Sequence, residues 1–115
     1  MNKVILIGRL TKVVEISEGK KATVGHYTLA IDNGKDYDTS FIRCTVFGKS
    51  AEFAEKYFSM GLRVAVEGRI QTGSYVDKDG FTHHTTDVIV ERQEFADGKK
   101  EEQPSGKSGV YKRYR

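Results

Sequence analysis

Residues 41–58 read FIRCTVFGKSAEFAEKYF and predict a strand that is followed directly by a helix. Side chains alternate between the two faces of a strand, so the first seven residues divide into two sets. The uniformly apolar set is Ile42, Cys44 and Val46. The mixed set is Phe41, Arg43, Thr45 and Phe47. We expect the apolar set to face a core and the mixed set to face solvent, although periodicity alone leaves the reverse arrangement open.

The second part of this stretch, residues 50–58, has the apolar spacing of an amphipathic helix. Ala51, Ala54 and Phe58 recur at helical intervals and form one stripe. Ser50 is a candidate N-cap, because its hydroxyl can accept a hydrogen bond from the first turn of the helix. Gly61 is well placed to end the helix.

Outward from this stretch, the sequence predicts only strands and turns. The predicted strands are 4–10, 26–31, 41–47 and 63–70, with a final hairpin whose arms are 74–76 and 82–91. Polar residues 17–21 and 32–36 are predicted connections, and Asp79-Gly80 marks the tip of the hairpin. Three strands, one helix and two further strands is the element order of an OB-fold. We therefore expect an all-β, five-stranded Greek-key barrel with one helix between its third and fourth strands.

The charge is distributed unevenly along the 115 residues. Residues 1–95 hold 13 Lys or Arg and 13 Asp or Glu, so the whole net charge of +3 lies in residues 96–115. The latter segment has no apolar period and holds the single proline. We therefore predict one globular domain over residues 1–95 and a flexible basic tail over residues 96–115. Bulk charge does not make the domain a nucleic-acid binder, so binding would depend on aromatic side chains and locally placed cations.

The chain has one cysteine and no long apolar run. Cys44 lies in the alternating strand, and we expect it to be a small buried hydrophobic residue. A reducing cytoplasm is the compartment that such cysteine usage favours. The apolar run Val4–Ile7 is too short for a signal peptide or a membrane span, so no membrane association is expected.

The sequence offers no constellation for catalysis. His83 and His84, with Asp87 nearby, superficially resemble a metal-ligand set. Adjacent residues of a strand point to opposite faces, so the two imidazoles are badly placed to share one ion. We find no phosphate-binding glycine loop and no nucleophile motif. The sequence therefore predicts a binding protein without catalytic residues, metal or cofactor.

Aromatic residues on predicted exposed surfaces are the candidate binding residues. Phe41 and Phe47 flank Arg43 on the mixed face of the strand, which suits base stacking beside a phosphate contact. Tyr75 lies near the tip of the hairpin, where there is little core to fill. The alternative for Tyr75 is ordinary cross-strand pairing with Phe81 or His83.

Basic residues near these aromatics are candidate phosphate contacts. Arg9 and Arg69, like Arg43, interrupt strand patterns that are otherwise apolar, which favours a specific role for them. Of the other basic residues near these aromatics, which also include Lys35 and Arg63, the candidates retained are Lys3, Lys49 and Lys78. For any one lysine, the alternative is an ordinary solvated surface residue.

Several segments together resemble the bacterial and phage single-stranded DNA-binding proteins of the SSB type. The segments, in chain order, are 1–11 (MNKVILIGRLT), 27–30 (YTLA), 46–49 (VFGK), 51–52 (AE), 66–72 (VEGRIQT) and 85–90 (TTDVIV). The resemblance covers residues 1–95. It implies an OB-fold, a homotetramer, and a cytoplasmic or nucleoid protein that coats single-stranded DNA in replication, recombination and repair.

The resemblance also bears on individual residues. It implies that bases stack on Phe41, Phe47 and Tyr75. Many cellular members have tryptophan at the first and last of these positions, whereas this chain has none. Cellular members usually end in an acidic tip that recruits other proteins, whereas residues 109–115 (GVYKRYR) are basic and aromatic. We therefore expect the partner-recruiting tail to be absent. The hypothesis for the basic segment is that it contacts nucleic acid, and the alternative is an inert solubilising tail.

Two other functions remain compatible with these patterns. The same fold could serve as an RNA-binding module. It could also serve as a scaffold that uses the barrel mainly for protein contacts.

Overall fold

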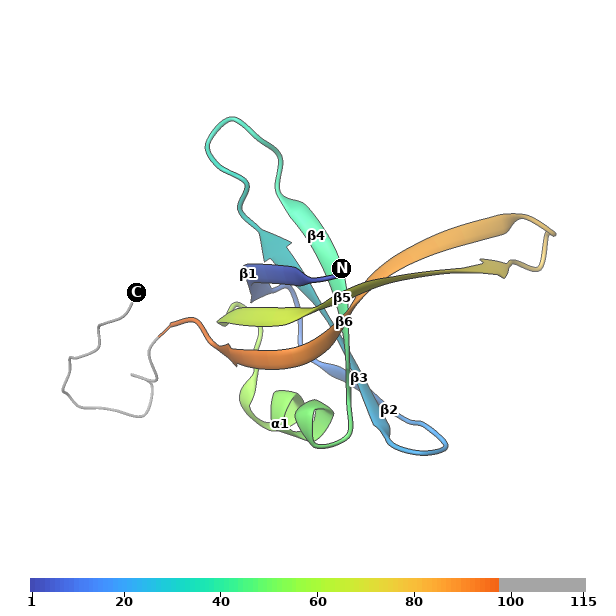
Figure 1. Ribbon diagram of the computed structural model, residues 1–115, viewed down its shortest axis with the longest axis horizontal. Helices are drawn as coiled ribbons and strands as arrows, with labels where there is room; N and C mark the ends of the chain where they lie inside the picture. Colours follow the sequence, from blue (N-terminus) through green and yellow to red (C-terminus); the bar gives the residue numbers. More distant parts are fainter. Residues whose placement is uncertain (98–115) are drawn as a thin grey trace.

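The computed structural model describes residues 1–97, which form six strands and one helix (Figure 1). In chain order these are β1 (Val4–Leu10), β2 (Glu15–Glu18), β3 (Thr23–Ile31), β4 (Ser40–Phe47), α1 (Lys49–Tyr57), β5 (Arg63–Val76) and β6 (Thr82–Phe95). The predicted tail, residues 96–115, lies outside the described residues except for Ala96 and Asp97.

Five of the strands close into a barrel. The hydrogen-bonded order is β1-β5-β6-β4-β3, and pairing of Arg9 with Ala30 on β3 returns the sheet to β1. All neighbours are antiparallel except β4 and β6, which pair in parallel at Cys44↔Val88 and Thr45↔Ile89. β2 adds a short edge to β3. The predicted OB-fold barrel, with its helix between the strands here labelled β4 and β5, is confirmed.

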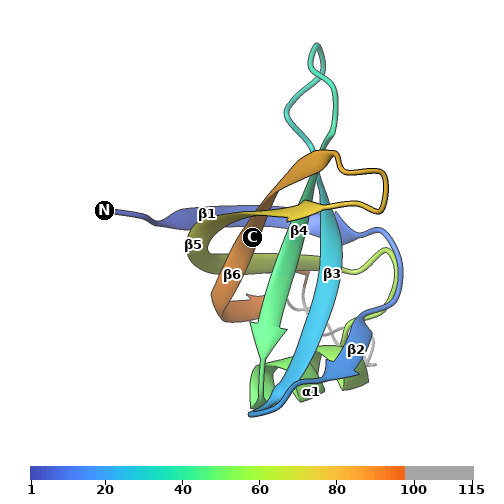
Figure 2. The same cartoon turned by 90° about the vertical axis from the view of Figure 1, so that its right-hand side faces the viewer.

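The core fills the barrel, and α1 covers one end of it (Figure 1, Figure 2). Cys44 and Val46 are fully buried, which confirms the predicted inward face of β4. The helix stripe is also confirmed, because Ala51 and Ala54 are fully buried and Phe58 is 4% exposed. Burial raises the pKa of the Cys44 thiol to about 12, so this side chain is an inert part of the core.

The start of α1 differs from the prediction. The N-cap is Gly48, not Ser50, and no side chain caps the helix. Gly48 has φ 62°, a backbone conformation that a residue with a Cβ rarely adopts. The chain needs this conformation to turn from β4 into the helix within one residue. Gly61 does not end the helix, because α1 stops at Tyr57. Gly61 lies in the turn that follows, where its N–H donates to the Leu10 carbonyl.

One strand, β2, was missed, and the predicted strands 26–31, 63–70 and 82–91 were too short. Ser17 and Glu18, predicted as part of a turn, belong to β2, a polar edge strand without a strong apolar signal. The predicted strand 63–70 and hairpin arm 74–76 are one continuous strand, β5. The two pieces looked separate because residues 69–76 are exposed at every position and therefore carry no apolar alternation. The ladder to β6 holds them in strand conformation instead.

Candidate nucleic-acid interface

The outer face of β4 carries the first predicted aromatics. Phe41 is 65% exposed and Phe47 is 48% exposed, so the alternative in which these rings fill the core is wrong. Arg43 lies between them and is also exposed. Thr45 shares this face but is only 6% exposed. Its hydroxyl lies 3.1 Å from Nδ1 of His26, its cross-strand partner on β3.

A shallow hollow lies beside Arg43. It is lined by Lys12, Val13, Glu15, His26, Tyr27, Thr28 and Arg43. Burial, and then the charge of Arg43, lower the pKa of His26, so its imidazole is neutral near pH 7. The hollow thus presents two cations, one carboxylate and a neutral imidazole. This set suits a phosphate together with the polar edge of a base.

The third aromatic lies on the β5–β6 hairpin, which projects from the barrel as a two-stranded arm (Figure 1). Tyr75 is 56% exposed, and its ring stacks on His83 of the facing strand with a centroid distance of 5.0 Å. Tyr75 therefore does pair across the strands with His83, as the alternative stated. Its ring nevertheless remains accessible. Phe81, at the end of the arm, is 69% exposed.

Strand register connects these two aromatic regions. Ile89 of β6 pairs with Arg69 of β5 on one side and with Thr45 of β4 on the other. Side chains alternate along a strand, so Arg69 and Tyr75 lie on the same face of β5. The barrel surface around β4 therefore continues along one face of the arm. We call the set Phe41, Arg43, Phe47, Arg69 and Tyr75 the stacking face.

Sequence comparison assigns this fold to a known group of proteins. The sequence model of the Single-strand binding protein family matches residues 1–96. The chain belongs to this family. The resemblance predicted from the sequence segments is thus confirmed.

Named relatives agree with this assignment. The "Single-stranded DNA-binding protein" of Clostridium perfringens is 45% identical over 100 residues, covering 84% of this chain and 67% of the relative. That of Clostridium tetani is 40% identical over 117 residues, covering 95% and 79%. "Single-stranded DNA-binding protein B" of Bacillus subtilis is 35% identical over 107 residues, covering 88% and 95%.

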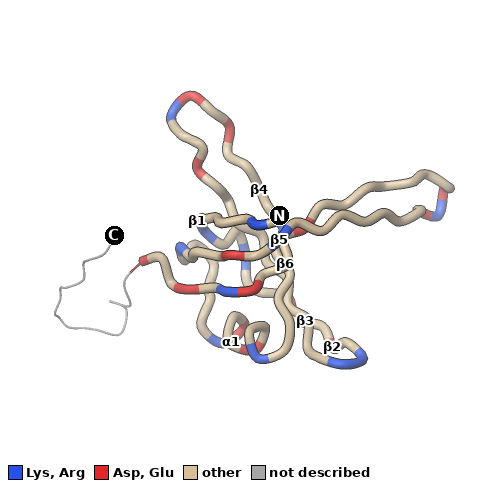
Figure 3. The backbone as a smooth tube through the Cα atoms, viewed as in Figure 1, with Lys and Arg blue, Asp and Glu red and all other residues tan. Residues whose placement is uncertain are grey.

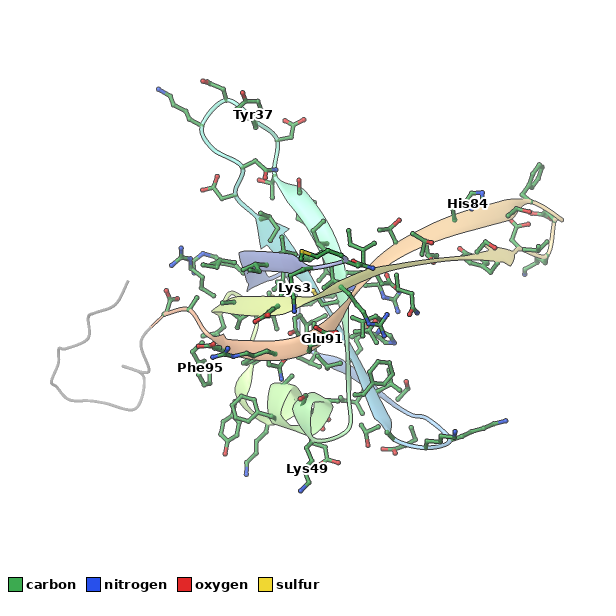
Figure 4. All side chains as sticks on the ribbon, viewed as in Figure 1. Lys3, Tyr37, Lys49, His84, Glu91 and Phe95 are labelled. Carbon is green, nitrogen blue, oxygen red and sulfur yellow. The ribbon has the colours of Figure 1, made fainter. Side chains whose placement is uncertain are left out.

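Lys3 and Arg69, two of the predicted phosphate contacts, lie in a cluster with two carboxylates. Lys3 Nζ lies 3.0 Å from a carboxylate oxygen of Glu67 and 3.4 Å from one of Glu91. Arg69 Nε lies 3.7 Å from the other oxygen of Glu91. The hydrogen bond to Glu67 raises the pKa of Lys3, and the same contact lowers the pKa of Glu67. The cluster lies where the hairpin leaves the barrel (Figure 4).

The other predicted cations are spread over the molecule. Arg9 lies at the end of β1, where its Nη1 donates to the Gly61 carbonyl at 3.1 Å. Lys49 begins α1, two residues after Phe47. Lys78 occupies the turn at the tip of the arm. Along the backbone of the described residues, Lys and Arg are interspersed with Asp and Glu, in line with the balanced charge of residues 1–95 (Figure 3).

The candidate metal ligands point in different directions. His83 faces Asp77, with Nε2 and Oδ2 2.6 Å apart, whereas the next residue, His84, points to the other face of β6. No group of three or more potential ligands that could hold a metal is found in residues 1–97. Within the same residues, no helix is long and apolar enough to cross a membrane.

Sequence reasoning missed three residues of this surface. Lys12 and His26 enter the hollow beside Arg43 because of strand register. His83 was considered only as a pairing partner of Tyr75 or as a metal ligand. No local motif reveals the first two. An exposed aromatic opposite a histidine in a hairpin could have pointed to the third.

Proposed function

We propose that this chain binds single-stranded DNA without sequence preference, and that the stacking face together with Lys3, Arg9, Lys49 and Lys78 forms the binding site. The observation that carries this proposal is the exposure of three aromatic rings along one continuous strand surface. Each of these rings is 48–65% exposed, so about half of its surface is available for stacking. Every base has a π-face, so stacking holds a strand without reading its sequence.

The charge balance of the domain indicates how much of the DNA affinity comes from stacking and how much from phosphate contacts. Residues 1–95 have no net charge, and Lys3 and Arg69 are already paired with carboxylates. Phosphate contacts would therefore contribute less than stacking, and Arg43 would be the principal cation because it lies between two rings. Such a site works by binding alone, without metal, cofactor or catalytic group.

The cellular setting follows from the binding. A protein that covers unpaired strands serves replication, recombination and repair, and would act in the cytoplasm at the nucleoid. Residues 1–95 would form the DNA-binding domain. The six basic residues among residues 96–115 would add phosphate contacts.

The outer face of β1 is an exposed apolar surface that suits contact with a second copy of the chain. Ile5 and Ile7 on the outer face of β1 are 72% and 48% exposed. Adjacent exposed isoleucines on a barrel strand favour burial in an interface. We therefore propose a homo-oligomer, a tetramer in keeping with the family resemblance.

The experiment that tests the function is titration with oligo(dT) of increasing length, with mass followed by light scattering. We expect tight binding above a minimum length, with one stoichiometry per oligomer. Competition with poly(U) separates the RNA alternative, because preferential displacement by poly(U) would favour an RNA-binding module. Failure of every oligonucleotide to bind would contradict the proposal and favour the scaffold alternative.

A further inference from the structure

The turn of the β5–β6 arm is organised by the side chain of Asp77. Its Oδ1 accepts hydrogen bonds from the backbone N–H groups of Asp79 and Phe81, each at 2.9 Å. Its Oδ2 lies 2.6 Å from Nε2 of His83. The bond with His83 is the largest cause that lowers the pKa of Asp77, so this carboxylate remains ionised well below pH 7. The imidazole is therefore held from one side by a fixed anion.

The flat face of the same imidazole lies against Tyr75. The two rings are 5.0 Å apart between centroids and are inclined by only 19°. Tyr75 remains 56% exposed in this arrangement, and the side chain of His83 is 47% exposed. An imidazole that is bonded at its edge and stacked on its face restricts the orientation of the tyrosine ring. A ring that is already oriented loses less conformational entropy when a base stacks on it.

We propose that His83, oriented by Asp77, is a positioning residue that presents the Tyr75 ring to a DNA base. This inference rests on the proposed function, because it requires a DNA strand to pass along the arm.

His84 provides a matched control for these effects. It is the next residue on β6 and is also exposed (Figure 4). Alternation places it on the face of the arm opposite to Tyr75. Any effect specific to His83 must therefore come from its stack on Tyr75 and its bond with Asp77.

The test uses the absence of tryptophan from the chain. In the Tyr75→Trp variant, quenching of the single tryptophan by poly(dT) reports stacking at this position directly. His83→Ala, His83→Phe and His84→Phe are then each introduced into the Tyr75→Trp parent and compared with it at pH 8. Far-UV circular dichroism checks that the fold is intact.

We expect His83→Ala to weaken poly(dT) binding about two- to tenfold at pH 8, the range for loss of one aromatic pair, and to reduce the quenching. His83→Phe should keep the parent affinity and quenching, because a flat ring still lies against position 75. His84→Phe should change neither, because it lies on the other face of the arm. If His83→Ala matches the parent in affinity and quenching, the inference is wrong.

The proposed function is tested separately in the same assay. If poly(dT) is bound and Phe47→Ala weakens binding, but the tryptophan at position 75 is not quenched, DNA does not follow the arm. The role of His83 is then refuted while DNA binding stands. If the parent binds no poly(dT), the proposed function itself fails.

Discussion

Phe47 and Tyr57 form a natural pair for testing whether aromatic exposure on the stacking face serves DNA binding. Their exposed fractions are 48% and 49%, but Phe47 ends β4, whereas Tyr57 ends α1. Each ring is half-buried. Removing either to alanine should thus cost about 1 kcal/mol of folding free energy, half of the roughly 1.5–3 kcal/mol for a fully buried side chain. The two variants should be about equally stable.

Their effects on DNA affinity should differ sharply. Stacking of one base is worth about 1–3 kcal/mol, so Phe47→Ala should weaken oligo(dT) binding about five- to 150-fold. Tyr57→Ala should change affinity less than about twofold, because its ring lies outside the stacking face. Fluorescence anisotropy of a labelled oligo(dT) measures both affinities, and thermal unfolding checks both folds. Equal affinity losses in the two variants would refute the assignment of β4 as the stacking surface.

Three further predictions concern the barrel that holds this surface. Gly68→Ala should lower the free energy of unfolding by about 1–3 kcal/mol, because the added Cβ would overlap the Ile89 carbonyl oxygen at the β5–β6 bulge. Urea titration measures this loss, and an unchanged midpoint would contradict it. Gln93→Ala should cost about 1–3 kcal/mol in the same titration, because the buried Tyr27 hydroxyl donates to Gln93 Oε1 at 2.8 Å and would lose its partner. Burial raises the pKa of the Cys44 thiol to about 12, so Cys44 should resist iodoacetamide at pH 8 in the native protein and react fully in urea. Mass spectrometry measures the alkylation, and rapid modification of the native protein would contradict this prediction.

The patterns that could be read from the sequence were those imposed by burial. The alternation through residues 41–47 placed Cys44 and Val46 inside, because one side of β4 contacts the core and the other contacts solvent. The helical stripe of Ala51 and Ala54 was legible for the same reason. Where one face of an element is buried and the other is in solvent, the polarity of each residue indicates the face on which it lies.

The remaining features depend on contacts between distant residues. The outer part of the arm is exposed on both faces, so its strand conformation depends on the ladder between β5 and β6 rather than on apolar spacing. Gly48 caps α1 because of the direction of the preceding strand. His26 meets Thr45, and His83 meets Tyr75, only through register. Register is set by the whole sheet, which explains why the first pair was missed and why the sequence left both Phe81 and His83 open as partners of Tyr75.

The central claim is that stacking, not net charge, holds the DNA. It is tested most directly by the salt dependence of poly(dT) affinity for the wild type and for the triple variant Phe41→Ala, Phe47→Ala, Tyr75→Ala. Three lost stacking contacts, at about 1 kcal/mol or more each, predict an affinity loss greater than about 100-fold. The slope of log affinity against log salt should stay nearly constant, because it counts phosphate contacts and every cation remains. An unchanged affinity, or a loss accompanied by collapse of the salt slope, would contradict the claim.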